Sequence, residues 1–453
     1  MTHLSFLRFG FFVLAGLALI SPIQAQTSQQ NQQKSLIHFT LQTEIAQGGM
    51  DFKGVGGVID GQHDPTLKVP VGANVQITLI DGDGSFHNLA IPAFKIQSNN
   101  VTGPQSQVQV SFKANQAGIY DYYCNIPGHR MIGMAGKIMV GTPASIPKSD
   151  AMDLSRDPTD IPPPIGKRGP QHLTFVLHTV ERLGRLNNGT SYHFWTFNGK
   201  VPGPMLRAKV GDTITVELHN DKSSSMNHSI DLHAVSGPGG GAGFMQVPPG
   251  QTKSFTFKAL HPGLFVYHCA TPMVAEHIAN GMYGMILIEP RQGLPRVDHE
   301  FYVMQGEIYT QQAFGTPGLA TEDTQALIQE KPTYIVFNGS VGALTQLHPM
   351  KADTHQTIRV YFGVGGPNLT SSFHIVGMIL NQTWIGGSLE NTPLRGLQTI
   401  SVPPGSALIT TFSTPTPGDY MMVDHALSRV NKGLGGMIEI DGPKNPAIFK
   451  SGP

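Results

Sequence analysis

The segment Val266–Met282, VYHCATPMVAEHIANGM, decides how the rest of the chain is interpreted. It places Cys269, His277 and Met282 on one loop. A thiolate, an imidazole and a thioether suit a copper ion, and two histidines, a cysteine and a weak axial methionine are typical of a blue-copper (type 1) electron-transfer site. The second imidazole is expected from an upstream strand, where the sequence NHSIDLH supplies His228.

Two further histidines next to this set indicate a second metal. Neighbouring side chains in an extended strand point to opposite faces, so His268 cannot bind the same ion as Cys269. His233, at the end of NHSIDLH, is also left over. Two copper sites joined through one peptide bond provide an electron-transfer path, as expected of a redox enzyme. The alternative, that these are ordinary residues of a β protein, requires this spacing to arise by chance.

Length and composition limit the other possibilities. A chain of 453 residues is long enough for two to four domains. Its 30 basic and 30 acidic residues give no net charge that would favour nucleic acid or an anionic membrane as a partner. The 53 Gly and 34 Pro favour many short strands and turns over helices.

The N-terminus predicts export to the periplasm. Residues 1–25 contain Arg8, the apolar run FGFFVLAGLALI and then SPIQA, the pattern of a secretory signal peptide. The run is shorter than the ~20 residues that a spanning helix needs, and we expect no membrane span elsewhere. Export would permit a disulfide between Cys124 and Cys269, but each cysteine lies in a ligand motif of its own.

A strand–loop–strand phrase occurs three times, at 117–140, 261–288 and 416–440, each after an upstream strand that carries a histidine. The pattern predicts an all-β protein of three tandem cupredoxin-like Greek-key β-sandwich domains. We expect these domains at 35–147, 171–292 and 298–443, with a Pro-rich linker at 148–170.

The three copies keep different ligands. The first has a complete type 1 set, which consists of His87, Cys124, His129 and Met134. The third has lost its cysteine and cannot form a blue site: His425 occupies the cysteine position and His374 the upstream histidine position.

The phrases FNGKVPGPMLR, NHSIDLH, VYHCATPMVAEHIANGMYG, SSFHIVG and VDHALSRVNKGLGGM make the region 171–443 resemble the copper-containing nitrite reductases, and the first copy resembles the extra N-terminal cupredoxin domain of one subgroup. The resemblance implies a homotrimer that reduces nitrite to nitric oxide, with two type 1 coppers and one type 2 copper per subunit. It implies His228, Cys269, His277 and Met282 as type 1 ligands. It implies His233 and His268 of one subunit and His425 of its neighbour as type 2 ligands.

The resemblance also implies that Asp231 and His374 handle protons over the type 2 copper. The chemistry agrees, because nitrite reduction consumes one electron and two protons at a metal with an exchangeable position. Thr399 is a candidate for orienting His374. The chain departs from many family members at Val376 and Ile379, which leaves the orientation of nitrite open but not the class of reaction.

Two other functions remain as alternatives. A multicopper oxidase needs His-x-His pairs and a histidine on each side of the cysteine, whereas Ala270 follows Cys269 here. A non-catalytic string of electron-carrying cupredoxins would leave the three type 2 candidates, His233, His268 and His425, without a role. For the enzyme, we expect a cytochrome c or a small cupredoxin as the electron donor.

Overall fold

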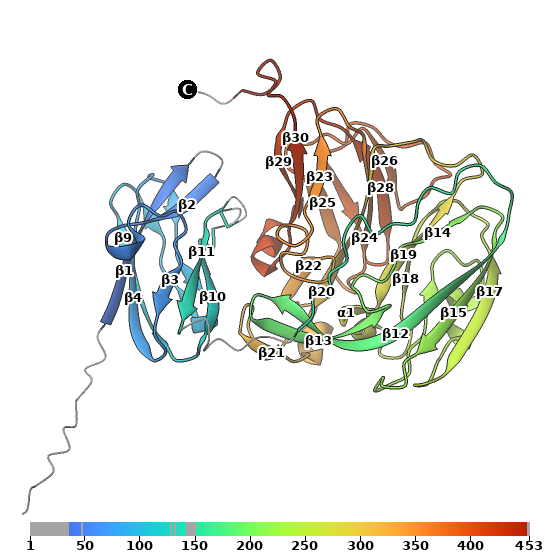
Figure 1. The fold of residues 1–453 in the computed structure, drawn as a ribbon, viewed down its shortest axis with the longest axis horizontal. Coiled ribbons are helices and arrows are strands. Elements are labelled where there is room, and N and C mark those ends of the chain that lie inside the picture. The colour runs from blue at the N-terminus through green and yellow to red at the C-terminus, as the bar shows by residue number, and fades with distance from the viewer. Residues whose placement is uncertain (1–35, 47–48, 127–128, 131–132, 142–150, 451–453) are drawn as a thin grey trace, which may run out of the picture. The chain divides into compact units, whose positions relative to one another are not determined.

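The computed structural model describes residues 36–46, 49–126, 129–130, 133–141 and 151–450. The expected signal peptide and residues 142–150 lie outside this part of the chain. The regular structure that is described is mostly β-strand, and the prediction of an all-β fold built from sandwiches is confirmed (Figure 1). Among the described residues, no helix is both long and apolar enough to cross a membrane.

The N-terminal unit (residues 36–141) consists of two sheets around one core. The first sheet has the order β2 (Gly49–Gly54), β1 (Leu36–Ala46), β4 (Ala73–Ile80), β9 (Gln107–Ala114). The second has the order β3 (Leu67–Val69), β11 (Ala135–Val140), β10 (Gly118–Tyr123), β6 (Ala90–Ile91), β7 (Ile96–Gln97), and a small ribbon pairs β5 (Phe86–His87) with β8 (Val101–Thr102). Its short 3-10 turns are Gly57–Ile59 and Pro92–Phe94.

The middle unit, whose strands lie mainly between residues 172 and 289, has the same two-sheet plan. One sheet has the order β17 (Thr252–Lys258), β15 (Thr213–Asn220), β12 (His172–Asn187), β13 (Thr190–Phe197), β21 (Gly318–Ala320). The other has the order β14 (Leu206–Lys209), β19 (Tyr283–Glu289), β18 (Gly263–His268), β16 (Asp231–Leu232). A 3-10 segment, η4 (Pro238–Phe244), and one helix, α1 (Val274–Ala279), interrupt its loops. In β15, buried and half-buried residues alternate, as expected of a strand with one face on the core.

The C-terminal unit, whose strands lie between residues 299 and 441, also has two sheets. Its first sheet has the order β22 (Tyr334–Phe337), β20 (His299–Ile308), β24 (Ile358–Val364), β28 (Ala407–Phe412), β26 (Gln382–Ile385). Its second has the order β23 (Met350–Asp353), β30 (Gly436–Asp441), β29 (Gly418–Asp424), β25 (Ser371–Ile375), β27 (Thr399–Val402). The helix α2 (Thr324–Ile328) and the 3-10 segment η5 (Leu427–Lys432) lie in its loops.

A shared hydrophobic core joins the middle and C-terminal units. It contains Met285 and Leu287 of β19 together with Tyr302 of β20 and Ile409 of β28. Every residue of β24 is buried, because this sheet packs on its own unit on one face and on the middle unit on the other. The strand β21 of the C-terminal unit also pairs with β13 of the middle unit.

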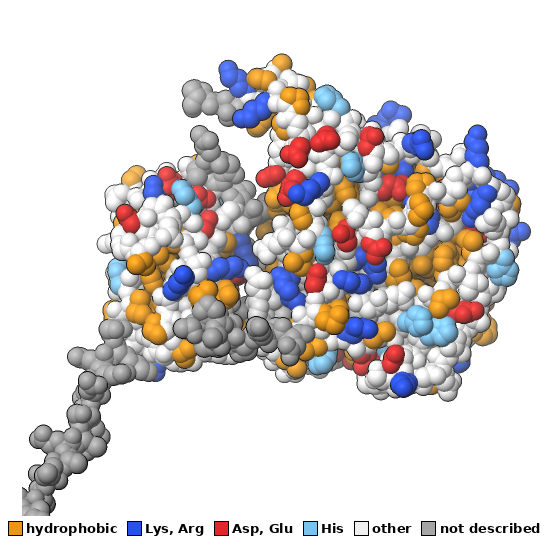
Figure 2. Space-filling view, in the orientation of Figure 1, with side chains coloured by type: hydrophobic (Ala, Val, Ile, Leu, Met, Phe, Trp, Pro, Cys, Tyr) orange, Lys and Arg blue, Asp and Glu red, His pale blue; other side chains and the backbone are white. Residues whose placement is uncertain are grey.

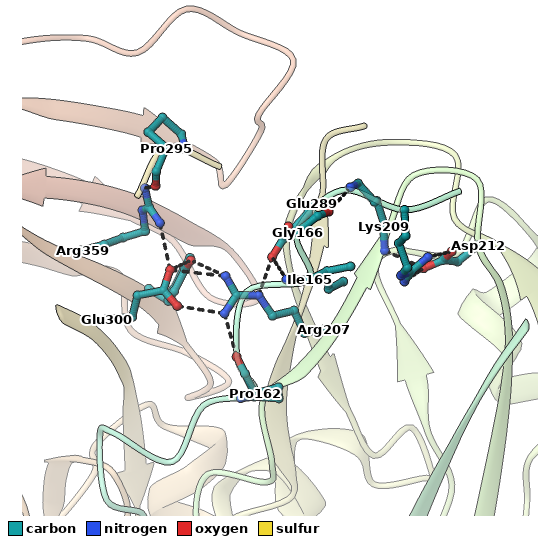
Figure 3. Close-up of polar contacts among 12 residues, drawn as sticks. Pro162, Ile165, Gly166, Arg207, Lys209, Asp212, Glu289, Pro295, Glu300 and Arg359 are labelled. Carbon is teal, nitrogen blue, oxygen red and sulfur yellow. Dashed lines mark hydrogen bonds and ion pairs between the residues drawn. The ribbon is translucent and has the colours of Figure 1, made fainter. Parts of the chain in front are cut away.

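A buried ion network reinforces the same junction (Figure 3). The Arg207 guanidinium donates to Glu289 at 2.6 Å and to Glu300 at 2.8 Å. Arg359 donates to the second oxygen of Glu300 at 2.8 Å, and the Tyr361 hydroxyl donates to it at 2.7 Å. Each buried charge therefore has a partner of opposite sign, the condition under which burial of charges is tolerated.

Part of the segment expected to be a Pro-rich linker packs against this body. Leu154 is buried in the shared core, and the backbone at Ser155 forms a bridge with Val201. Arg156 donates from Nε to the Pro202 carbonyl at 2.7 Å. One apolar side chain and several backbone hydrogen bonds hold residues 152–158 in place.

The surface is electrostatically mixed. On the face shown in Figure 2, basic and acidic side chains are interspersed over the middle and C-terminal units. This agrees with the equal numbers of basic and acidic residues in the sequence.

Candidate metal centres

Three groups of metal-binding side chains form among the described residues, and each has its ligand atoms within 4.8 Å of one another. The groups are His87, Cys124 and His129; His228, Cys269 and His277; and Asp231, His233 and His268. Both cysteines are free and buried, so neither forms the disulfide considered as an alternative.

The second group, in the middle unit, assembles around the end of β18. The Cys269 Sγ lies 3.3 Å from His277 Nδ1, and the Nδ1 atoms of His228 and His277 are 3.2 Å apart. The Met282 side chain is fully buried, and its backbone accepts from the Cys269 N–H at 3.0 Å. His277 lies in α1, so a helical turn occupies the eight-residue step between cysteine and histidine.

Burial sets the charge of this group. Desolvation lowers the pKa of both His228 and His277 to about 4 and raises the pKa of the Cys269 thiol. The imidazoles are therefore neutral near pH 7, as metal ligands must be, whereas a thiolate at this depth needs a positive charge beside it. Two converging imidazole Nδ1 atoms and a buried sulfur fit copper.

The N-terminal unit repeats this arrangement. The Cys124 Sγ lies 3.5 Å from His129 Nδ1 and 3.9 Å from His87 Nδ1. Met134 is fully buried, and its backbone both accepts from the Cys124 N–H and donates to the His129 carbonyl. These four side chains match the donor set of the middle unit, and they fit copper for the same reason.

The third group has histidines and a carboxylate but no sulfur. The Nε2 atoms of His233 and His268 are 3.2 Å apart, and Asp231 Oδ2 lies 3.9 Å from His268 Nε2. Asp231 is directly opposite His268 in the register of β16 and β18. The His268 Nδ1 lies 2.9 Å from the Cys269 carbonyl, an acceptor, so Nδ1 carries the proton and Nε2 faces the group with its lone pair free.

A glycine-rich turn that was not predicted from the sequence packs against Asp231. Gly239, Gly240 and Gly241 in η4 all have positive φ. A Cβ on Gly240 would lie 1.7 Å from Asp231 Oδ1, so only glycine permits this approach. The run PGGGAGF, which follows NHSIDLH closely, is the sequence signal for it.

The two other predicted residues, His374 and His425, lie together and are not part of this group. The rings of His374 and His425 have centroids 5.2 Å apart, and neither residue belongs to the group of Asp231, His233 and His268. The His374 Nδ1 lies 2.9 Å from the Gln398 carbonyl and 3.3 Å from Thr399 Oγ1, so Thr399 contacts His374 as expected.

The two positions that depart from the family pattern are exposed in the chain. Val376 follows His374 by two residues and is 44% exposed, and Ile379 is 58% exposed. Neither contributes a donor to a metal group.

Comparisons with known proteins agree with the donor sets. A copper-binding model of the plastocyanin/azurin family matches residues 41–141, and a multicopper oxidase model matches residues 180–293. The copper-containing nitrite reductase of Neisseria meningitidis serogroup A is 45% identical over 292 residues, which are 64% of this chain and 75% of that protein. The chain belongs to the copper-containing nitrite reductase family.

Other members of the copper-containing nitrite reductase family are also similar to this chain in sequence or structure. The enzyme of Cereibacter sphaeroides is 33% identical over 66% of this chain and 87% of its own length. The solved copper nitrite reductase of Nitrosomonas europaea aligns with 61% of this chain and 96% of its own, at 33% identity and a TM-score of 0.55. A copper-containing nitrite reductase from Thermus scotoductus aligns with 61% of this chain and 64% of its own, at 28% identity and a TM-score of 0.53.

Proposed function

We propose that this chain is a dissimilatory nitrite reductase that converts nitrite, one electron and two protons into nitric oxide and water. The observation that carries the proposal is the junction of two donor groups at His268 and Cys269. The thiol belongs to the Cys–His–His group, and the imidazole belongs to the neighbouring one. One peptide bond and the hydrogen bond from His268 Nδ1 to the Cys269 carbonyl connect them.

Bound at these donors, copper would carry electrons at the two type 1 sets and offer nitrite an exchangeable position at a set of three neutral imidazoles. We assign His87, Cys124, His129 and Met134 to one type 1 set and His228, Cys269, His277 and Met282 to the other. We assign His233, His268 and His425 to the type 2 set. This gives two type 1 coppers and one type 2 copper per chain.

The chain's own residues would manage the protons. Asp231 lies beside His268 and under the Gly240 turn, and it can donate to the oxygen that leaves nitrite as water. His374, whose Nδ1 lies 2.9 Å from the Gln398 carbonyl, would supply the second proton from Nε2. Burial lowers the pKa of His268, which keeps its Nε2 available to a metal at neutral pH.

The active unit in this proposal is a homotrimer. His425 lies beside His374 and outside the group of His233 and His268, whereas His233 is exposed. A neighbouring subunit could therefore bring His425 and His374 to His268 through the exposed side of His233. We further propose domains at 35–147, 171–292 and 298–443, with a linker at 148–170.

The N-terminal domain, in this view, receives electrons for the catalytic pair of domains. Its group of donors includes no histidine beyond the two of a type 1 set. We propose export to the periplasm through the signal peptide at 1–25, and a cytochrome c or small cupredoxin as donor.

Two alternatives are less well supported. Multicopper oxidase chemistry would need a histidine after Cys269, where Ala270 stands. A pure electron carrier would not need the Asp231–His233–His268 group.

Copper content and electron paramagnetic resonance test the assignment. Fully loaded protein should contain three coppers per chain, with type 1 and type 2 signals. Cys269→Ala should remove one blue site and stop nitrite turnover while the type 2 signal stays. Only two coppers per chain and no type 2 signal would contradict the proposal.

A further inference from the structure

The two Cys–His–His–Met groups have the same donors but different surroundings. We propose that Asp83 and Ser229 tune the two sites, so that the N-terminal site has the lower reduction potential and the site at Cys269 the higher one. The inference rests on the proposed function, because it assumes copper at both groups. It supplies a direction for electron flow that the donor sets themselves do not reveal.

A buried carboxylate lies behind a ligand in the N-terminal group. Asp83 Oδ1 is 3.0 Å from His87 Nε2, and the Asp83 side chain is 7% exposed. Its Oδ2 is buried without a hydrogen-bond partner, and His87 is its one ion-pair partner among the described residues. A carboxylate bonded to a ligand histidine makes the imidazole a stronger donor and adds negative charge, and both effects favour the more highly charged Cu(II).

The corresponding contact is longer in the middle unit. His228 Nε2 lies 3.4 Å from Glu181 Oε1 and has no hydrogen-bond partner of suitable geometry among the described residues. Each carboxylate also accepts from a backbone N–H, Asp83 from Ser85 at 2.8 Å and Glu181 from Ser225 at 2.7 Å, but Glu181 accepts from the Ser225 hydroxyl as well. The carboxylate effect on the potential is therefore weaker at this site.

The contacts to the cysteine sulfurs also differ, and here the middle unit has the additional contact. In each group the residue after the upstream histidine donates its N–H to the sulfur, Asn88 at 3.5 Å to Cys124 and Ser229 at 3.3 Å to Cys269. The Asn88 side chain makes its hydrogen bonds with Asn125 N–H and Asn100 instead of the sulfur.

The Ser229 hydroxyl is placed differently from the Asn88 amide. It accepts from the Ala270 N–H at 2.9 Å, which leaves its proton free to point at the Cys269 sulfur 3.9 Å away. Hydrogen bonds to the sulfur reduce the electron density that a thiolate gives to copper, which favours Cu(I) and raises the potential.

Solvent access acts in the same direction as these two contacts. His277 is buried, whereas His129 is partly exposed. Water near a ligand stabilises the higher charge of Cu(II), whereas a dry site favours Cu(I). Transfer in the favoured direction moves one electron from the N-terminal site, which goes from Cu(I) to Cu(II), to the site at Cys269, which goes from Cu(II) to Cu(I). No bond breaks and no proton moves.

Spectroelectrochemical titration of the full chain tests the order. Cys124→Ala leaves only the blue site of the middle unit, and Cys269→Ala leaves only the N-terminal one. We expect the first variant to have the higher midpoint, by at least a tenfold change in the equilibrium constant, or about 59 mV for one electron. Equal or reversed midpoints would overturn the inference.

Tuning variants then identify the residues, each in the matching single-site background. Asp83→Asn should raise the N-terminal midpoint and Ser229→Ala should lower that of the middle unit, each by about threefold or more in the equilibrium constant. Asn88→Ser, which introduces a hydroxyl at the matched position, should raise the N-terminal midpoint even if Asp83→Asn fails to fold. Glu181→Gln is the control and should change the midpoint of the middle unit less than Asp83→Asn changes the N-terminal one.

The outcomes separate this inference from the proposed function. Loss of all blue absorption in either single-site variant would contradict the copper assignment. Two blue sites whose midpoints do not respond to Asp83→Asn, Asn88→Ser or Ser229→Ala would contradict the tuning alone.

Discussion

His268 and Cys269 are consecutive in the chain but serve different clusters, and the Nδ1 of His268 lies 2.9 Å from the carbonyl of Cys269. The hydrogen bond fixes the tautomer of His268, because the carbonyl can only accept. It therefore directs the lone pair of Nε2 toward His233 and Asp231. A short covalent path and a fixed imidazole are what transfer of one electron between two metals requires.

Subunit mixing tests whether the type 2 set is shared. His268→Ala and His425→Ala should each be inactive alone, because each lacks one ligand. If trimers exchange subunits at equal ratio, about a quarter of the interfaces receive both intact halves, and nitrite turnover should recover to that extent. The measurement is turnover before and after exchange.

The control for mixing uses two ligands from the same half of the site. His233→Ala mixed with His268→Ala should recover nothing, since every interface then lacks one of them. Proven exchange without recovery in the first pair would mean that one chain supplies all three ligands.

Asp231→Asn and His374→Ala test the proton donors. Each should lower turnover by about 10² or more, the usual scale for general acid catalysis, while the blue absorption stays. Val376→Ile is the control and should have a far smaller effect, because it adds one methylene to an apolar, exposed position. Wild-type turnover in both proton-donor variants, with chemistry rate-limiting, would remove both residues from this role.

Cys124→Ala tests the N-terminal copper as an electron relay. Turnover with a small artificial reductant should stay nearly unchanged, because such a molecule reaches the catalytic domains directly. Turnover with a protein donor should fall, because tethering gives the N-terminal domain an effective concentration in about the mM range at the catalytic domains. If Cys124→Ala behaves as wild type with every protein donor tested, a docking or structural role remains.

The copper-free protein should lose stability as the pH falls from about 6.5 to about 4. In the folded chain, burial lowers the pKa of His228 and His277 to about 4. In the unfolded chain both bind protons below an ordinary pKa of about 6.5, so acid favours the unfolded state. At about 1.4 kcal/mol per pKa unit, each histidine contributes a loss of about 2 kcal/mol by pH 5.

Thermal unfolding of chelated protein at pH 7 and pH 5 measures this loss. The variants His228→Gln and His277→Gln should each show a smaller drop in melting temperature between the two conditions. An equal drop in both variants and in wild type would place the pH dependence elsewhere in the chain.

Arg207→Met should destabilise the middle and C-terminal units. It removes the cation between Glu289 and Glu300, and breaking a buried ion pair costs about 3–5 kcal/mol. Chemical unfolding followed by fluorescence measures the change. Arg291→Met at an exposed position is the matched control and should stay within about 0.5 kcal/mol of wild type.

The all-β fold could be predicted from the sequence, and so could the grouping of Cys269 with His228 and His277. Cys269, His277 and Met282 lie on one loop, so their spacing is a local property that can be read directly. Side chains alternate between the two faces of a strand, which predicted that His268 and Cys269 belong to different groups, and the structure places them so. The helix α1 inside that loop was not predicted, because a helix of six residues is too short to give a periodic signal.

Tertiary structure decided the environment of each donor. Pairing of β16 with β18 brings Asp231 opposite His268, and the turn at Gly240 comes over the carboxylate. Asp83 contacts the ligand His87 in the N-terminal unit, and the Ser229 hydroxyl faces the Cys269 sulfur in the middle unit. Both contacts are set by loop geometry. The identity of a ligand depends on the chemistry of one side chain. The reduction potential of a bound copper and the protonation of its ligands depend on atoms that only long-range packing brings near.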